Sequence, residues 1–150
     1  MRLIADTGGI VAAMNSAEPN HELFRSTLES ASVAVVSPLV VAEVHYLLST
    51  VGAHEAASDF LEDLAGGFYE LAAIAPADYS VAAALISRYE GHMERKRRKP
   101  GSLDLADAMN IVIAQHYATN LILATDQDYR ATTPLSGHPY FVLLPADLSL

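Results

Sequence analysis

Four acidic residues occupy positions where a parallel α/β fold gathers its ligands. Two directly follow short apolar runs that are typical of buried strands, and two lie in otherwise apolar helical segments; they are Asp6, Asp126, Glu43 and Asp107. Ligands of open parallel sheets bind outside the carboxyl ends of the strands. Carboxylates gathered there raise one another's pKa unless a cation neutralises them, and Mg²⁺ or Mn²⁺ suits such hard oxygen ligands. The constellation therefore predicts metal-assisted hydrolysis of a phosphodiester.

Each of these acids, taken alone, also has a structural interpretation. Asp6 is equally explained as the cap of a turn. Glu43 is alternatively explained as the partner of a buried arginine, although basic residues are scarce. Asp104 lies three residues before Asp107 on the same helix face, and a role in the helix dipole explains it better than metal ligation. Asp128 is equally explained as a helix N-cap. Only the joint placement of the acids predicts a site.

Short strands alternate with helices along the chain. The predicted strands span residues 2–6, 33–36, 68–71, 121–123 and 140–144, and the predicted helices 20–30, 38–49, 53–64, 76–89 and 102–117. We expect Thr7 to cap a further helix after the first strand through its hydroxyl, and Ser102 to cap the last one. Residues 91–101 are interpreted as a loop or a frayed helix end. The alternation predicts one domain over residues 1–150, a three-layer α/β/α sandwich around a short, mostly parallel sheet.

Composition excludes several classes of protein. An apolar fraction of 51% and a mean hydropathy of +0.22 exclude intrinsic disorder. The absence of cysteine excludes disulfides and thiolate metal sites, and the six histidines lack the spacing of a zinc site. No apolar run reaches the roughly 18 residues of a membrane span, and Asp6 falls where a signal peptide needs apolar residues. We therefore expect a cytoplasmic protein with no membrane contact.

Four segments, in this order, resemble the motifs of the PIN-domain ribonucleases, in particular the VapC toxins of bacterial toxin–antitoxin pairs. They are residues 3–7 (LIADT), 37–44 (SPLVVAEV), 105–110 (LADAMN) and 123–129 (LATDQDY). The resemblance implies that the four acids hold Mg²⁺ or Mn²⁺, with Thr7 and Asp128 in support. It also implies an endoribonuclease acting on tRNA or rRNA, a homodimer, and inhibition by a cognate VapB-type antitoxin. Such a partner threads a C-terminal segment, often carrying arginine, over the acidic pocket.

Two departures from the family pattern surround the acids. Gly8 and Gly9 follow Asp6-Thr7, where family members usually have Ser or Asn and then Ala, so we expect a looser first turn. A hydroxyl residue often stands two positions before the last acid, whereas here that position is Ala124 and Thr125 is its neighbour. These departures concern the surroundings of the acids and leave the acids themselves in place.

The net charge of −9 is unevenly distributed. Five of the nine basic residues form one run, and the remaining four face eighteen acidic residues. The run consists of Arg95, Lys96, Arg97, Arg98 and Lys99. Because neutralising phosphates supplies most non-specific affinity for nucleic acid, we expect it to follow an RNA backbone; a solvated loop without a partner is the alternative. No aromatic residue interrupts the run, so base stacking is not indicated there.

Two hypotheses for function follow. In the first, the four acids hold one or two ions, a metal-bound water attacks phosphorus in line, and the products carry a 5′ phosphate and a 3′ hydroxyl. In the second, a catalytically silent PIN module binds RNA or a protein partner. We prefer the enzyme, because a silent module gains nothing from four grouped carboxylates. Phosphoaspartate enzymes are excluded, because the only lysines lie at 96 and 99 and position 8 is glycine.

Overall fold

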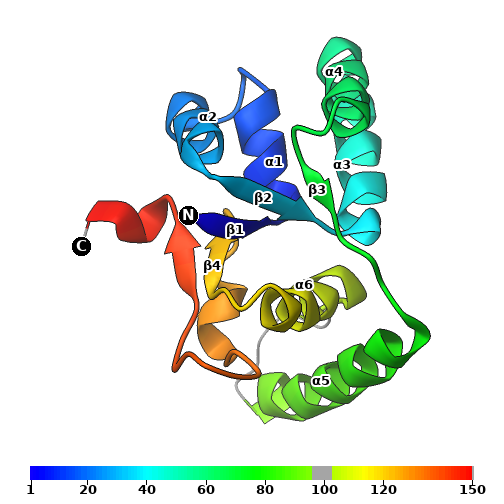
Figure 1. The fold of residues 1–150 in the computed structure, drawn as a ribbon, viewed down its shortest axis with the longest axis vertical. Helices are drawn as coiled ribbons and strands as arrows, with labels where there is room; N and C mark the ends of the chain where they lie inside the picture. The colour runs from blue at the N-terminus through cyan, green and yellow to red at the C-terminus, as the bar shows by residue number, and fades with distance from the viewer. Residues whose placement is uncertain (96–102, 150) are drawn as a thin grey trace.

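The computed structural model describes residues 1–95 and 103–149, and a five-stranded parallel sheet lies at its centre (Figure 1). Its strands are β1 (Arg2–Ala5), β2 (Val33–Val36), β3 (Glu70–Leu71), β4 (Leu121–Leu123) and β5 (Val142–Leu144). They lie in the order β3-β2-β1-β4-β5, and every neighbouring pair is parallel. The order reverses its direction between β1 and β4, which is where open α/β sheets bind their ligands.

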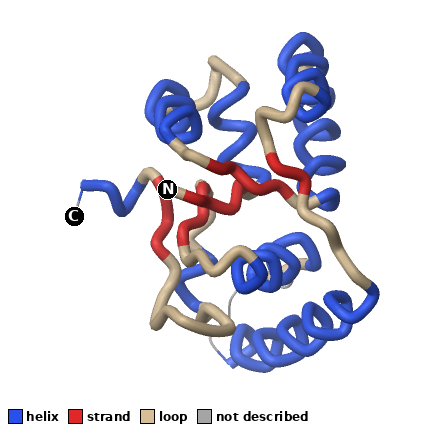
Figure 2. Tube along the Cα trace, viewed as in Figure 1, coloured by secondary structure: helices blue, strands red, loops and turns tan. Residues whose placement is uncertain are grey.

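Helices cover both faces of this sheet. Figures 1 and 2 show α1 (Thr7–Met14), α2 (His21–Ser30), α3 (Pro38–Thr50) and α4 (His54–Ala65) on one face, and α5 (Pro76–Arg95) and α6 (Leu105–His116) on the other. Two short 3₁₀ helices, η1 (Asp128–Ala131) and η2 (Ala146–Ser149), flank β5. The three-layer α/β/α architecture predicted from the sequence is confirmed. Within the described ranges, no helix has the length and apolar character needed to cross a membrane.

The central strand shows why the sheet is buried on both faces. In β1, Leu3 and Ala5 pack into the apolar cluster under α1–α4, while Ile4 packs into the cluster under α5 and α6, and all three are fully buried. Successive side chains of a strand point to opposite faces. An uninterrupted apolar run closed by an acid is therefore the pattern of a strand between two helix layers.

Local signals set the helix starts and ends that were predicted correctly. The Ser37 hydroxyl accepts a hydrogen bond from the Leu39 N–H at 3.1 Å, and Pro38 takes the first helical position of α3. Helix α4 ends at Ala65, and Gly67 follows with a φ of +81°, a conformation that costs glycine little.

Other boundaries differ from the prediction. Asp104, rather than Ser102, is the N-cap of α6, and Ser102 lies outside the described residues. Helix α5 continues to Arg95, because residues 90–95 contain no proline to end it. Strand β3 is shorter than predicted and spans only Glu70 and Leu71; it is an edge strand and pairs on one side only. Strand β5 starts at Val142, two residues later than predicted.

Candidate active site

Asp6 lies where the first strand meets its neighbour at the carboxyl edge of the sheet. In the β1–β4 register Ala5 is opposite Leu123, and the Asp6 N–H continues the pairing by donating to the Leu123 carbonyl at 3.0 Å. Asp6 is only 5% exposed. It holds the N-cap position of α1, yet its side chain makes no capping hydrogen bond there. The carboxylate is therefore free of the turn-capping role that the sequence left open.

Glu43 reaches the same edge from α3. It is half-buried in the second turn of that helix, and the Thr7 hydroxyl donates to its Oε1 at 3.4 Å. The prediction that Thr7 caps α1 through its hydroxyl is wrong, because this hydroxyl faces α3. The ion pairs among the described residues do not include Glu43, so no arginine explains its burial.

Asp104 and Asp107 form a reciprocal cap at the start of α6. The Asp107 N–H donates to Asp104 Oδ1 at 2.9 Å, and the Asp104 N–H donates to Asp107 Oδ2 at 3.4 Å. This capping box satisfies backbone donors that a helix start otherwise leaves open. It fixes Asp107, one of the predicted ligands, at the third helical position, and it gives Asp104 the structural role that we favoured for it.

A buried polar chain joins Asp6 to Asp107. The side-chain nitrogen of Asn110 donates both to Asp6 Oδ1 and to the Tyr129 hydroxyl, each at 3.0 Å. The Tyr129 hydroxyl in turn donates to Asp107 Oδ1 at 3.2 Å. Asn110 is fully buried, and its own Oδ1 has no hydrogen-bond partner.

Asn110 and Tyr129 were missed as site residues, although a signal for one of them was present. Asn110 is the single amide in the otherwise apolar stretch 108–114, three residues after Asp107 and thus on the same helix face. A buried polar side chain needs a partner, so this position indicates a polar neighbour. Nothing in the spacing of Tyr129 separates it from a core aromatic.

Asp126 completes the group from the loop after β4. It is half-buried, and its Oδ1 accepts a hydrogen bond from the Asp128 N–H at 2.8 Å, which closes the turn into η1. The backbone of Asp128, rather than a distant element, thus orients the Asp126 carboxylate. Asp128 is the first residue of η1, and Gln127 is the N-cap, so the prediction of Asp128 as a helix N-cap is wrong.

The acids influence one another's protonation. Burial, with the charges of Asp126 and Glu43, raises the pKa of Asp6 to about 6. Burial, with the charges of Asp6, Asp104 and Asp126, raises the pKa of Asp107 to about 8. Burial and the charge of Asp104 raise the pKa of Glu43. The structure therefore brings Asp6, Glu43, Asp107 and Asp126 together into one mutually repelling group.

The two glycines after Thr7 tighten the site instead of loosening it. A Cβ on Gly9 would collide with the Leu123 carbonyl of β4, and a Cβ on Gly8 would collide with the Thr125 hydroxyl. The expected looser turn is therefore wrong: α1 packs directly against the end of β4 because these positions lack side chains. Thr125, predicted near the last acid, is the side chain that fills the space over Gly8.

The predicted RNA-binding run lies almost entirely outside the described residues. Lys96, Arg97, Arg98 and Lys99 are not described, and Arg95 is placed only as the last residue of α5. Its predicted role stays a prediction.

The donor set fits a hard divalent cation by its chemistry. All the converging ligand atoms are oxygens of carboxylates, which Mg²⁺ and Mn²⁺ prefer, and the ion pairs among the described residues bring no cation to these four acids. Within the same ranges, no three His, Asp or Glu side chains already stand as a complete ligand set around one point. Binding would thus require side chains to adjust toward the ion.

Comparison with known proteins agrees with this geometry. Residues 3–133 match the family described as PIN domain. Ribonuclease VapC26 of Mycobacterium tuberculosis is 34% identical over 143 residues, which cover 94% of this chain and 99% of that protein. The crystal structure of VapC20 from Mycobacterium tuberculosis, described as a Sarcin-Ricin loop cleaving toxin, superposes with a TM-score of 0.74 at 18% identity. That match covers 91% of this chain and 99% of the VapC20 chain.

Proposed function

The chain belongs to the PIN-domain family of VapC-type ribonucleases, and we propose that it is a divalent-metal-dependent endoribonuclease toxin formed by a single domain over residues 1–150. The observation that carries this proposal is the convergence of Asp6, Glu43, Asp107 and Asp126 at the point where the strand order reverses. The identity to VapC26 over nearly the whole of both chains supports the same activity.

We propose that these four carboxylates hold Mg²⁺ or Mn²⁺. When bound, such an ion supplies Lewis acidity, which activates water and stabilises charge on the scissile phosphate and its leaving oxygen. Asp6 and Asp107 would be held at fixed separation for this task by Asn110 and Tyr129. Glu43 would be oriented by the Thr7 hydroxyl, and Asp126 by the Asp128 N–H.

The side chains that position Asp6 and Asp107 are themselves buried. Asp6 and Asn110 are nine-tenths buried or more, as is Tyr129, and the positioning side chains come from α6 and η1. Positioning of this kind favours in-line hydrolysis that leaves a 5′ phosphate and a 3′ hydroxyl. The basic run from Arg95 to Lys99 would guide the RNA backbone toward this edge.

Incubation with RNA tests the activity. Purified protein is mixed with a panel of tRNA and rRNA fragments in MgCl₂, in MnCl₂ and with EDTA, beside the Asp6→Asn variant. We expect site-specific cleavage with either metal, and none with EDTA or with the variant. Cleavage that persists with EDTA or in Asp6→Asn would reject the proposed site. Binding of RNA without cleavage in all conditions would favour the catalytically silent module.

We also propose that a VapB-type antitoxin inhibits the protein in the cytoplasm. The acidic edge suits a basic segment, since an arginine there would neutralise carboxylates that otherwise repel one another. A neighbouring short reading frame that encodes a protein with a basic tail, and whose product suppresses cleavage when co-purified, is the expected outcome.

A homodimer is the assembly that we propose. Tyr46 on α3 and Val51, the C-cap of that helix, are exposed by 68% and 64%, and Leu71 on the edge strand β3 is exposed by 56%. We propose that these side chains contribute to the dimer contact, because burial of exposed apolar surface stabilises association. Light scattering should give twice the chain mass for the wild type, and the Tyr46→Glu/Val51→Glu variant should be a monomer.

A further inference from the structure

A pocket adjoins the acidic site. Its volume is about 400 Å³, and it lies between the loop that precedes α2 and the residues that follow β4 and β5. Thr125 and Gln127, the two chain neighbours of Asp126, form part of its wall. A phosphate held at Asp126 would therefore leave this pocket within reach of an adjoining nucleotide.

We propose that this pocket binds one base of the RNA substrate, next to the phosphate that is cleaved, and that it selects bases with an exocyclic amino group. The inference rests on the proposed ribonuclease function and deepens it by naming a specificity site. A pocket of this size matches those that hold small organic ligands, roughly 300–1,000 Å³.

The walls have the chemistry of a base site. Leu23, Phe24 and Pro145 give apolar faces, which suit the flat surface of a base. Asn20, Gln127 and Glu18 add polar side chains to the lining. Such amides and carboxylates are the side chains that read base edges, and a carboxylate accepts from an amino group.

Those polar groups are available to a ligand. Asn20 is the N-cap of α2 with a φ of +60°, yet its carboxamide makes no capping hydrogen bond. The Glu18 side chain has no hydrogen bond or ion pair among the described residues. Gln127 Oε1 accepts from Arg130 Nε at 2.6 Å, which leaves the Gln127 amide nitrogen as a donor.

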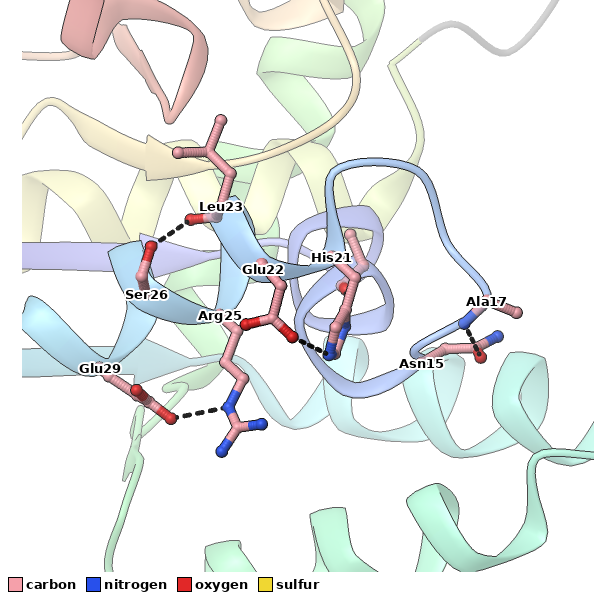
Figure 3. A network of polar contacts seen from close by, with 9 residues as sticks. Asn15, Ala17, His21, Glu22, Leu23, Arg25, Ser26 and Glu29 are labelled. Atoms are coloured by element: carbon pink, nitrogen blue, oxygen red, sulfur yellow. Dashed lines mark hydrogen bonds and ion pairs between the residues drawn. The ribbon is translucent and has the colours of Figure 1, made fainter.

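The loop that carries Glu18 and Asn20 is held in place before any ligand arrives. Figure 3 shows the hydrogen bond between Asn15 and Ala17, and the His21 ring beside the Glu22 carboxylate. Asn15 Oδ1 accepts from the Ala17 N–H at 3.1 Å. The His21 Nδ1 lies 2.8 Å from the Ala12 carbonyl of α1. A wall fixed to α1 and α2 in this way loses little freedom on binding, which favours affinity.

The charge of the pocket distinguishes a base from other occupants. No lysine or arginine is among the described residues that line it, and Glu18 would repel a phosphate or an acidic peptide. A basic side chain could only donate hydrogen bonds, and would leave the Asn20 and Gln127 amide donors without acceptors. A base with an amino group offers both donors and acceptors. Uracil has no amino group, and its one edge donor, the N3–H, lies between two carbonyls that the Glu18 carboxylate would repel.

Titration with mononucleotides tests the proposal on the full chain. AMP, GMP, CMP, UMP and ribose 5-phosphate are added in MgCl₂, and binding is followed by NMR at the amides of Asn20 and Gln127. We expect at least one amino-bearing nucleotide to shift these amides and to bind about tenfold more tightly than UMP or ribose 5-phosphate. Equal binding of ribose 5-phosphate would overturn the proposal.

Matched variants localise the effect. Glu18→Gln should remove the discrimination against UMP, whereas Glu55→Gln, at an exposed position of α4 outside the pocket, should not. Ala146→Phe, which blocks the pocket, should weaken nucleotide binding about tenfold, whereas Ala84→Phe on the exposed face of α5 should leave it unchanged. If Ala146→Phe leaves nucleotide binding intact but abolishes binding of a synthetic arginine-rich peptide, the pocket is a protein site and the proposal is wrong.

Failure of this proposal can be told apart from failure of the proposed function. If RNA is cleaved and Glu18→Gln and Ala146→Phe leave the cleavage positions unchanged, the base site is wrong and the ribonuclease stands. If no RNA is cleaved but mononucleotides still shift Asn20 as expected, the base site stands without the catalytic activity.

Discussion

Two pairs of aspartates in this chain lie in contrasting environments. Asp78 accepts from the Ala75 N–H at 2.8 Å and contacts the His116 ring at 2.8 Å, and these two partners lower its pKa. Asp147 accepts from Arg130 at 2.7 Å and from the Leu143 N–H at 2.7 Å, again with a lowered pKa. Both hold secondary-structure elements together through donors that stabilise the charged carboxylate.

The acids at the edge of the sheet have the opposite surroundings. Burial and neighbouring carboxylates raise the pKa of Asp6 to about 6 and that of Asp107 to about 8. The side-chain donors that reach them, Asn110 and Tyr129, are neutral, and so is the Asp104 N–H that donates to Asp107. The fold thus satisfies its structural acids from within and leaves the charge of the edge acids to be balanced by something else, which is what a metal site requires.

Substituting one acid in each environment should have the largest effect and should separate the roles of the two environments. Asp107→Asn should lower the rate of RNA cleavage by more than about a hundredfold, because a ligand is lost. It should not destabilise the metal-free protein at pH 8, because a repelling charge is removed. Cleavage assays and thermal unfolding measure the two effects.

Asp147→Asn is the matched control at a structural position. It should lower the unfolding temperature by a few degrees through loss of the Arg130 contact, while cleavage stays within about twofold of wild type. A hundredfold loss of activity in this variant would contradict the purely structural role of Asp147.

Removing one hydroxyl should show how far the edge acids depend on their positioning chain. Tyr129→Phe deletes the bridge between Asn110 and Asp107. Mn²⁺ affinity, measured by calorimetry, should fall by about 10–100-fold. Tyr89→Phe is the control, since its hydroxyl accepts from the Thr133 N–H at 3.1 Å away from the acids. Equal metal affinity in both variants would show that Tyr129 only fills space.

The pH dependence of stability follows from the direction of the pKa shifts. Asp6 and Asp107 keep their protons to higher pH in the folded chain than in the unfolded one, so the folded state binds more protons between about pH 4 and pH 8. The free energy of unfolding of the metal-free protein should therefore fall as pH rises through this range. Since one pKa unit corresponds to about 1.4 kcal/mol, a loss of a few kcal/mol is expected.

Denaturant unfolding at pH 5.5 and pH 8.5, with and without MnCl₂, measures this effect. Added metal should raise stability more at pH 8.5, where the carboxylates are charged. A metal-free protein that is more stable at pH 8.5 than at pH 5.5 would contradict the repulsion between the edge acids.

Substitution of the two glycines after Thr7 should give the smallest of the expected effects. Gly9→Ala meets the Leu123 backbone carbonyl, which cannot move aside, and should cost about 1–3 kcal/mol of stability. Gly8→Ala meets only the Thr125 hydroxyl, so it should cost less. Adding Thr125→Ala should rescue Gly8→Ala and not Gly9→Ala. Rescue of both would mean that the packing of α1 on β4 is looser than described.

Much of the architecture was predictable because its signals are local. Runs such as Val33–Val36, the Pro38 helix start and the glycines that follow α4 act over a few residues, and each predicted element with such a signal is present. That the four acids lie near one another was predictable for a related reason, since the carboxyl ends of parallel strands share one edge of the sheet.

The sequence alone determined the fold class and the types of residue at the edge, because apolar periodicity and carboxylate chemistry are properties of short segments. Tertiary structure alone decided that Asn110 and Tyr129 link Asp6 to Asp107, that Thr7 turns toward Glu43, and that Thr125 fills the space over Gly8. The hydrogen bond from Asn110 to Asp6, for example, joins residues 104 positions apart. Their geometry depends on strand order and helix packing, which no local pattern encodes.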